Sequence, residues 1–358
     1  MNTVKIKHNL KKYKKAVIFA SIAFIGLIAV YRRNVKVINS YLSDWFFKLS
    51  VKLALPYEKV RTVEKIKIVE VMLETHESTE KVDETKTAPI EEKPAEKIID
   101  AAAGIMNLND ILNYDYAMKN FYVVQSTTSI PREKLNLEEL CGLDLTIKKD
   151  PSVPQILILH THGEERFADS SSTGKTIVDA GTYLSEILEK EYGYGVIHVT
   201  DSFDLVNGVF DRDKAYEYSN AKIDEVLKEN PSIQVVIDLH RDGVPESKRL
   251  VTKVNGKDTA KIMLFNGICH SDVSNGYKGD MNPYLKENLA LTYKMYLAGK
   301  LISPDFIRCI YIADYKYTLY HVPRSMLVEA GAQNNTFEEI LNAMEPLAGI
   351  IDKVLTCG

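Results

Sequence analysis

Three apolar runs in this chain of 358 residues each end in side chains that could bind a metal ion or transfer a proton. The first run, residues 157–159, leads directly into His160, His162 and Glu165. His162 and Glu165 have H-x-x-E spacing, and a tight turn can bring an imidazole and a carboxylate onto one zinc ion. The spacing alone is short and common, and the alternative interpretation is a polar turn with a hydrogen-bonded histidine. The apolar run and the second histidine favour a metal site.

The second run, residues 235–239, is followed by His240. This histidine would complete a set of two histidines and one glutamate, which Zn²⁺ accepts in catalytic sites with water in the fourth position. Asp238 or Asp242 could orient the imidazole ring of that histidine. Arg241 could bind a substrate carboxylate through two hydrogen bonds, or it could form a surface ion pair.

The third run, residues 325–328, ends in Glu329. A carboxylate at the end of an apolar strand is costly to bury unless it is paired or functional. Beside a metal-bound water it could act as general base and then as general acid, and the alternative is an ion pair with a lysine or arginine. The role of His160 stays open, because the spacing favours His162 as the ligand and leaves His160 as an outer contact, an oxyanion contact or the alternative ligand.

These runs belong to a series of strands that alternate with helices from about residue 102 onward. Such alternation predicts an α/β fold with a mostly parallel sheet covered by helices on both faces. Because such sheets bind ligands beyond the carboxyl ends of their strands, the three motifs should meet at one edge. The expected strands are residues 155–159, 196–199, 233–239, 261–266, 306–313 and 325–329, and the main expected helices are residues 175–192, 213–229, 283–300 and 336–355.

The N-terminal residues predict a transmembrane anchor. Residues 1–15 contain six lysines, and residues 16–33 hold an uncharged run closed by two arginines. That run would form a helix of about 24 Å, slightly short of a hydrocarbon core of about 30 Å, and snorkelling basic side chains could make up the difference. The excess of lysines before the run predicts a cytoplasmic N-terminus and an extracytoplasmic remainder. A cleaved signal peptide is the alternative, although no A-x-A-like site follows.

Composition sets the remaining boundaries. Residues 34–101 are expected to form a juxtamembrane segment and a charged linker rich in Glu, Lys and Thr, and residues 102–358 the catalytic domain. The net charge of −4 gives no sign of a nucleic-acid partner. The four cysteines lack C-x-x-C spacing, so we expect mostly buried thiols and no cysteine zinc site.

Taken together, the motifs resemble the stage II sporulation protein P family. The resemblance covers roughly residues 115–355 and rests on H-T-H-x-x-E after an apolar strand, I-D-L-H-R-D, L-V-E-x-G and x-N-T-F-E-E. It implies a fold like that of the zinc N-acetylmuramoyl-L-alanine amidases (the amidase_3 group), related more distantly to the zinc carboxypeptidases. In that wider group, positions matching His162, Glu165 and His240 bind zinc, and the position matching Glu329 is the general base. One departure is A-G-A-Q-N-N-T after the late glutamate, where a Gly-Gly form is expected.

The resemblance also implies a biological setting. It implies a peptidoglycan amidase, with DD-endopeptidase activity as a further option, that acts in engulfment during endospore formation. The implied partners are stage II sporulation proteins D and M, and the implied location is the cell membrane, with the catalytic domain in the intermembrane space of the sporulating cell. The alternative function is a catalytically inactive peptidoglycan-binding or scaffold component of the sporulation membrane complex. The sequence leaves the bond preference and the oligomeric state open.

Overall fold

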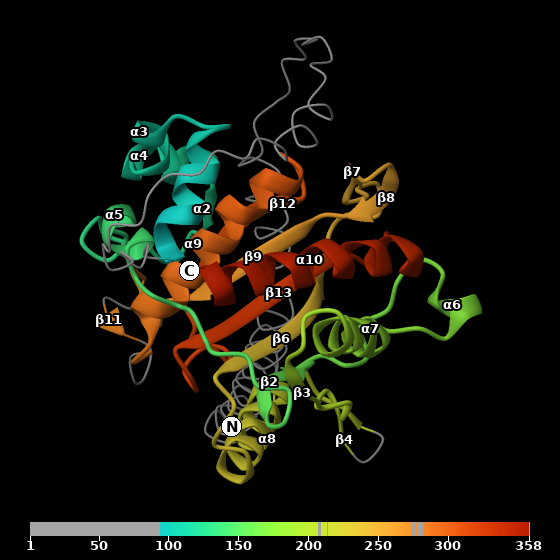
Figure 1. Cartoon of the computed structure of the whole chain (residues 1–358). Coiled ribbons are helices and arrows are strands. Elements are labelled where there is room, and N and C mark those ends of the chain that lie inside the picture. Colours follow the sequence, from blue (N-terminus) through green and yellow to red (C-terminus); the bar gives the residue numbers. More distant parts are fainter. Residues whose placement is uncertain (1–93, 207–208, 213, 274–275, 278–281, 358) are drawn as a thin grey trace, which may run out of the picture. The chain divides into compact units, whose positions relative to one another are not determined.

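The computed structural model describes residues 94–206, 209–212, 214–273, 276–277 and 282–357 (Figure 1). The chain divides into residues Met1–Pro56 and Tyr57–Gly358, and all of the described residues belong to the second unit. The predicted cytoplasmic segment, the predicted anchor at 16–33 and the linker up to residue 93 lie outside them. Among the described residues, no helix is both long enough and apolar enough to cross a membrane.

A seven-stranded sheet forms the centre of the described part. Its strands lie in the order β1-β12-β9-β13-β6-β2-β3. Neighbouring strands are parallel except where β9 meets β13 in antiparallel register. The mostly parallel sheet is therefore confirmed, with one antiparallel junction. The strand bounds are β1 Tyr122–Val124, β2 Pro154–Leu159, β3 Gly195–His198, β6 Val235–Asp242, β9 Ile262–Gly267, β12 Ile307–Ala313 and β13 Arg324–Ala332.

The antiparallel junction decides which strand ends can meet. The carboxyl ends of β3, β2, β6 and β13 lie at one edge of the sheet, and those of β9, β12 and β1 lie at the opposite edge. Three short two-stranded pairs lie outside the sheet: β4 (Leu205–Val206) with β5 (Val209–Phe210), β7 (Val251–Val254) with β8 (Lys257–Ala260), and β10 (His270–Ser271) with β11 (Gly276–Tyr277).

Helices pack against both faces of the sheet. The long ones are α7 (Ile177–Lys190), α8 (Ala215–Glu229), α9 (Leu285–Ile302) and α10 (Phe337–Cys357). The short ones are α2 (Pro94–Ala103), α3 (Leu108–Ile111), α4 (Tyr114–Asn120), α5 (Leu137–Cys141) and α6 (Ser170–Thr173). The expected long helices and strands are all present, with ends that differ by a few residues.

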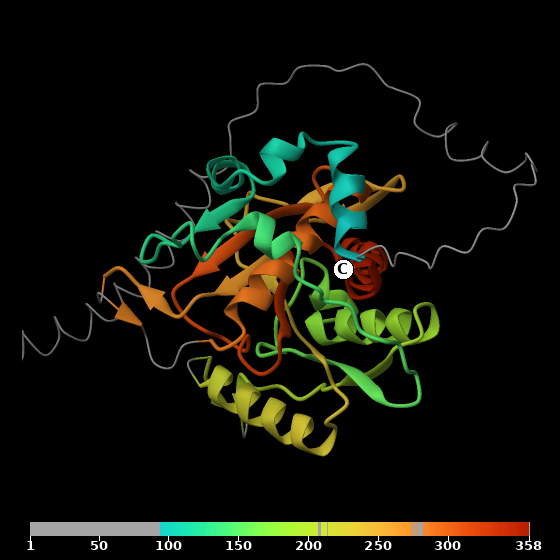
Figure 2. The ribbon, with the colours of Figure 1, turned by 60° about the vertical axis from the view of Figure 1, so that its left-hand side comes forward.

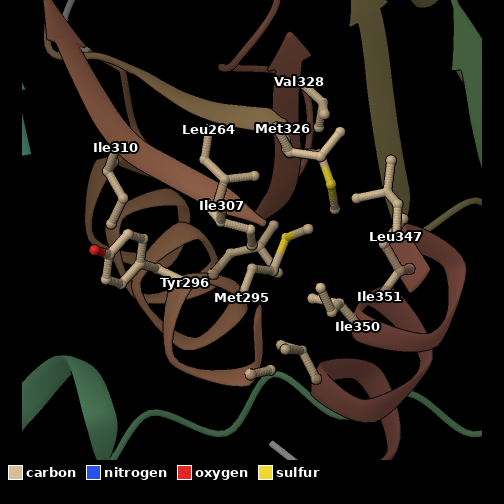
Figure 3. Close-up of a cluster of buried hydrophobic side chains, with 14 of the residues drawn as sticks. Leu264, Met295, Tyr296, Ile307, Ile310, Met326, Val328, Leu347, Ile350 and Ile351 are labelled. Carbon is tan, nitrogen blue, oxygen red and sulfur yellow. The ribbon is translucent and has the colours of Figure 1, made fainter. Parts of the chain in front are cut away.

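Side-chain alternation along β6 shows the two faces. Val235, Ile237 and Leu239 join the main core with α7, α9 and α10, whereas Val236 joins a smaller core with α8. In Figure 2, α7 and α8 lie on either side of β2. Figure 3 shows the main core, where side chains of β9, β12 and β13 pack against α9 and α10. The second face, which carries Asp238 and His240 as well as Val236, is the face that matters for chemistry.

The packed body begins earlier than the composition predicts. Most of helix α2 lies within the expected linker, yet Ile98, inside that linker, and Ala102, just after it, are completely buried in the main core. These two residues are four apart and so share one face of the helix. The Glu- and Lys-rich composition around them concealed this short apolar face. As expected, the cysteines are free thiols, buried at positions 141, 269 and 309 and half-buried at 357.

Candidate metal centre and active site

The three predicted motifs meet because β6 lies between β2 and β13. Both later strands extend past the predicted ends, β6 to Asp242 and β13 to Ala332. His240 and Glu329 therefore lie within strands, as direct neighbours in the parallel register. Because adjacent strands are about 4.8 Å apart, the two side chains stand next to each other on one face. The loop after β2 adds His162 and Glu165 at the same edge.

His240 is held by a buried carboxylate on its own strand. Its Nε2 lies 2.8 Å from Asp238 Oδ1, and its Nδ1 lies 3.7 Å from Glu165 Oε2. Asp238 is fully buried and also accepts hydrogen bonds from the Thr161 amide (2.9 Å), the Thr161 hydroxyl (2.7 Å) and the Thr318 hydroxyl (3.0 Å). Of the two aspartates that sequence reasoning left open, Asp238 is the one that forms an ion pair with the ring, although Nε2 of His240 has no hydrogen-bond partner among the described residues. That contact leaves Nδ1 of His240 facing the candidate ligand Glu165.

The charges of Asp238 and His240 stabilise each other. Burial alone would lower the pKa of His240, but the carboxylate of Asp238 outweighs it and raises that pKa to about 9. Burial would likewise raise the pKa of Asp238, but His240 and the Thr161 hydrogen bonds lower it to about 2. An aspartate this acidic is a permanent hydrogen-bond acceptor at neutral pH, which is what an imidazole ligand needs from its outer partner.

Glu165 is fixed by two arginines. Its Oε1 accepts a hydrogen bond from the Arg212 guanidinium at 2.9 Å, and its Oε2 accepts one from the Arg241 backbone amide at 2.8 Å. The Arg241 guanidinium donates to the carbonyls of Arg166 (3.1 Å) and Asp242 (3.3 Å). Through these hydrogen bonds, Arg241 stabilises the loop that carries Glu165. Its predicted contact with a substrate carboxylate is untested.

His162 lies between the other ligand candidates and a buried acid. Its ring is 5.4 Å from the ring of His240 and 5.5 Å from that of Tyr216. Its Nδ1 lies 3.6 Å from Asp204 Oδ2, a residue that sequence reasoning missed. Neither of these two buried atoms has a hydrogen-bond partner within the part of the chain that the structure describes. Burial lowers the pKa of His162, which favours the neutral ring that a metal requires.

His160 occupies a different environment from His162. It is completely buried, its Nδ1 lies 2.8 Å from the Leu239 carbonyl and its Nε2 lies 2.9 Å from Nε2 of His198. Nδ1–H must be the donor to the carbonyl, so Nε2 accepts from His198. Burial, reinforced by His198, lowers the pKa of His160 to about 3, so the ring stays neutral. Both nitrogens are engaged, and the ring supports the strand residue that directly precedes His240.

Glu329 presents a carboxylate that is poised to change protonation. Its Oε2 is buried and has no hydrogen-bond partner among the described residues. Burial raises the pKa of Glu329 to about 8, and the nearby carboxylate of Asp242 adds to this rise. Asp242 itself forms a buried ion pair with Arg308, another residue that no sequence pattern indicated. Among the described residues, no lysine or arginine forms an ion pair with Glu329.

His162, Glu165 and His240 are residue types that bind zinc, and one distance between their donor atoms is close to that expected around a zinc ion. For bonds of about 2.1 Å, two ligand atoms on tetrahedral zinc lie about 3.4 Å apart, close to the 3.7 Å between His240 Nδ1 and Glu165 Oε2. As the described side chains stand, no three histidine, cysteine, aspartate or glutamate residues surround one metal position. The ring of His162 lies 5.4 Å from that of His240, and Glu329, whose buried Oε2 has no hydrogen-bond partner among the described residues, pairs with His240 in the strand register.

Other polar residues fall outside this cluster. His321 lies between Asn220 (Nε2 to Oδ1, 2.7 Å) and Asp224 (Nδ1 to Oδ1, 3.0 Å) on α8. His198 contacts the buried ring of His160 through Nε2. No local spacing pointed to Asp204, Arg212 or Arg308, because each reaches the site from a distant part of the chain.

Fold and site together define an α/β protein with two histidines and two glutamates gathered at one sheet edge. The chain belongs to the stage II sporulation protein P family, whose model matches residues 41–352. The resemblance seen in the motifs is thereby confirmed. Among curated proteins, a search found no match to this chain.

Solved structures give weaker likenesses. An N-acetylmuramoyl-L-alanine amidase, AmiC2 of Nostoc punctiforme, is 13% identical with a TM-score of 0.32, covering 58% of this chain and 97% of its own. An N-acetylmuramoyl-L-alanine amidase from Clostridium difficile 630 is 15% identical with a TM-score of 0.33, covering 56% and 94%. The CwlD amidase from Clostridioides difficile, solved in complex with the GerS lipoprotein, is 17% identical with a TM-score of 0.32, covering 56% and 95%. Likenesses at this level carry no argument about the site of this chain.

Proposed function

We propose that this chain is a zinc-dependent peptidoglycan hydrolase of sporulation that cleaves the amide bond between muramic acid and L-alanine. One observation carries the proposal: His162, Glu165 and His240 gather at one sheet edge beside the carboxylate of Glu329. Membership of the stage II sporulation protein P family supplies the setting of sporulation.

His162, Glu165 and His240 would hold the metal ion. When bound, zinc would polarise a water molecule and the carbonyl of the scissile amide. Two of these side chains already have contacts that restrict them: Asp238 forms an ion pair with His240, and two arginines donate hydrogen bonds to Glu165. Ligands held in this way lose little conformational entropy when the ion binds.

Glu329 would move the proton. It pairs with His240 in the strand register, so its side chain lies on the same face of the sheet as that candidate ligand. A carboxylate beside a metal-bound water can take a proton from the attacking water and return it to the leaving amine. Glutamate is suited to both halves of the reaction because it is not tied to a partner within the described residues.

Cleavage of purified peptidoglycan tests this function. The full-length chain in detergent, loaded with zinc, is expected to release stem peptides that begin with a free L-alanine amine, which mass spectrometry of the digest detects. The matched variant His240→Ala is expected to release none. Products cut within the peptide cross-links would instead indicate a DD-endopeptidase. No products from the zinc-loaded wild type would favour the alternative, an inactive peptidoglycan-binding or scaffold component.

The cellular arrangement is part of the same proposal. A single-pass anchor at residues 16–33 would hold the catalytic domain outside the cytoplasm, in the intermembrane space of the sporulating cell. Stage II sporulation proteins D and M are the proposed partners, and the family membership supports that assignment. Protease accessibility of the catalytic domain in intact protoplasts would test the orientation.

A further inference from the structure

We propose that Asp204 is a positioning residue of the metal centre, holding His162 through Nδ1 so that the ring presents Nε2 to the metal. The inference rests on the proposed zinc function. The ring of His240 is turned the other way, with Nε2 2.8 Å from Asp238 and Nδ1 3.7 Å from Glu165.

The first support is an unpartnered pair of buried atoms. Asp204 is 1% exposed, and its Oδ2 faces His162 Nδ1 at 3.6 Å. Across the described ranges, neither atom has a hydrogen-bond partner. Burying a carboxylate oxygen without a donor is costly. The separation exceeds a charge-assisted hydrogen bond by about 0.8 Å, so a small rotation of the ring closes it.

The second support is the way Asp204 is itself fixed. Its Oδ1 accepts a hydrogen bond from the Ser202 hydroxyl at 2.9 Å, and its backbone carbonyl accepts one from the Asp211 amide at 2.9 Å. These contacts leave Oδ2 as the oxygen available to His162. A carboxylate aimed by its own partners at one ring nitrogen is the arrangement that fixes the tautomer of a metal-binding histidine.

The chemistry of a neutral imidazole then determines the ligand atom. Such a ring has one N–H donor and one nitrogen lone pair. If Nδ1–H of His162 donates to Asp204, the lone pair is on Nε2, which is the only nitrogen left for a metal. Asp238 faces Nε2 of His240 in a similar way, at 2.8 Å. Each candidate histidine thus has its own aspartate.

The chain segment that carries Asp204 also reaches Glu165. Asp204 directly precedes β4, and Arg212 follows β5, the strand paired with β4. Arg212 donates to Glu165 Oε1 at 2.9 Å. The residues that flank this strand pair therefore contact two different candidate ligands: Asp204 faces His162, and Arg212 binds Glu165. This arrangement explains why two ionised side chains converge on the site from a region without motif residues.

Zinc affinity of the full-length chain in detergent, measured by competition with a chelator, tests the inference. Asp204→Asn is expected to weaken zinc binding about 10- to 100-fold, while the thermal midpoint of the metal-free protein stays near that of the wild type. The matched control, Asp201→Asn, changes an exposed aspartate of the same segment and is expected to bind zinc normally. Ser202→Ala, which removes the hydroxyl that aims Asp204, should weaken binding in the same direction by less.

Three outcomes would overturn the inference. Wild-type affinity in both Asp204→Asn and Ser202→Ala would show that the carboxylate does not position His162. X-ray absorption of the bound zinc that shows one oxygen ligand fewer in Asp204→Asn would make Asp204 a ligand and not a positioning residue. A wild-type chain that binds no zinc would overturn the proposed function as well, which distinguishes that failure from the first.

Discussion

Gly181 of α7 packs against the rings of His160 and His198, so a substitution at this position tests how much the buried His160 ring stabilises the site. An alanine Cβ at this position would lie 2.5 Å from Cε1 of His160 and 2.9 Å from Nε2 of His198, and it would also overlap Nε2 of His160. All of these atoms are ring atoms, and the His160 ring is completely buried. Gly181→Ala must therefore displace the His160 ring from its hydrogen bonds to Leu239 and His198.

The expected magnitude combines opposing effects. Alanine in place of glycine within a helix is favourable by about 1 kcal/mol. Forcing a methyl group into a packed core costs about 1–3 kcal/mol, and leaving buried hydrogen-bonding groups of His160 and Leu239 unsatisfied costs about 1–3 kcal/mol more. We expect Gly181→Ala to lower the free energy of unfolding by about 1–5 kcal/mol. Zinc affinity should fall too, because Leu239 directly precedes His240.

Chemical denaturation of the full-length chain in detergent measures the effect. Gly142→Ala is the control, since its Cβ would meet the nearest atom, the Glu138 carbonyl oxygen, at an ordinary 3.5 Å; it should change stability by less than about 0.5 kcal/mol. In a His160→Ala background, Gly181→Ala should cost little, because the clashing ring is gone. Equal stability of Gly181→Ala and the wild type would refute this reasoning, as would an equal loss in both backgrounds.

Three further perturbations address other contacts. His162→Ala should abolish zinc binding measured by chelator competition, whereas His160→Ala should retain it, because both nitrogens of His160 are already engaged; the reverse result would exchange their roles. Arg308→Met should lower the free energy of unfolding, measured with a denaturant, by about 3–5 kcal/mol, because it leaves Asp242 buried and unpaired. Adding Asp242→Asn should restore part of this free energy. No restoration would mean that the lost ion pair is not the cause. Burial lowers the pKa of Lys294 to about 8, so its protonation opposes folding. The wild type should therefore gain stability relative to Lys294→Met as pH rises from about 8 toward 10.5, and a pH-independent difference would contradict this.

The candidate ligands could be predicted from the sequence because local patterns carry them. His162, Glu165, His240 and Glu329 each follow or end an apolar run, and parallel strands bring such ends together. The choice between Asp238 and Asp242 could not be made, since both lie two residues from His240 and so share its face of the strand. The structure separates their roles, because Asp238 contacts the His240 ring and Asp242 forms a buried ion pair with Arg308.

The outer contacts of the site could not be predicted, because they form between distant segments. Asp204 is 42 residues from His162, and Arg212 is 47 residues from Glu165. The residues around Asp204 and Arg212 form no motif that would indicate these contacts. His198 lies in strand β3, and the alternation of residues along that strand does not predict its contact with His160, which follows β2. The start of the packed body was also missed, because the apolar face of α2 consists of few residues within a charged stretch.

Glu329→Gln tests the central claim most directly, because this variant separates a catalyst from a metal-binding scaffold. The change removes the proton acceptor while keeping the size of the side chain, so zinc content and thermal midpoint should match those of the wild type. The rate of muropeptide release, measured on the same preparation, should fall about 10²- to 10⁴-fold. Peptidoglycan cleavage by Glu329→Gln at the wild-type rate would contradict the account, and loss of zinc would make Glu329 a ligand in place of His162, Glu165 or His240.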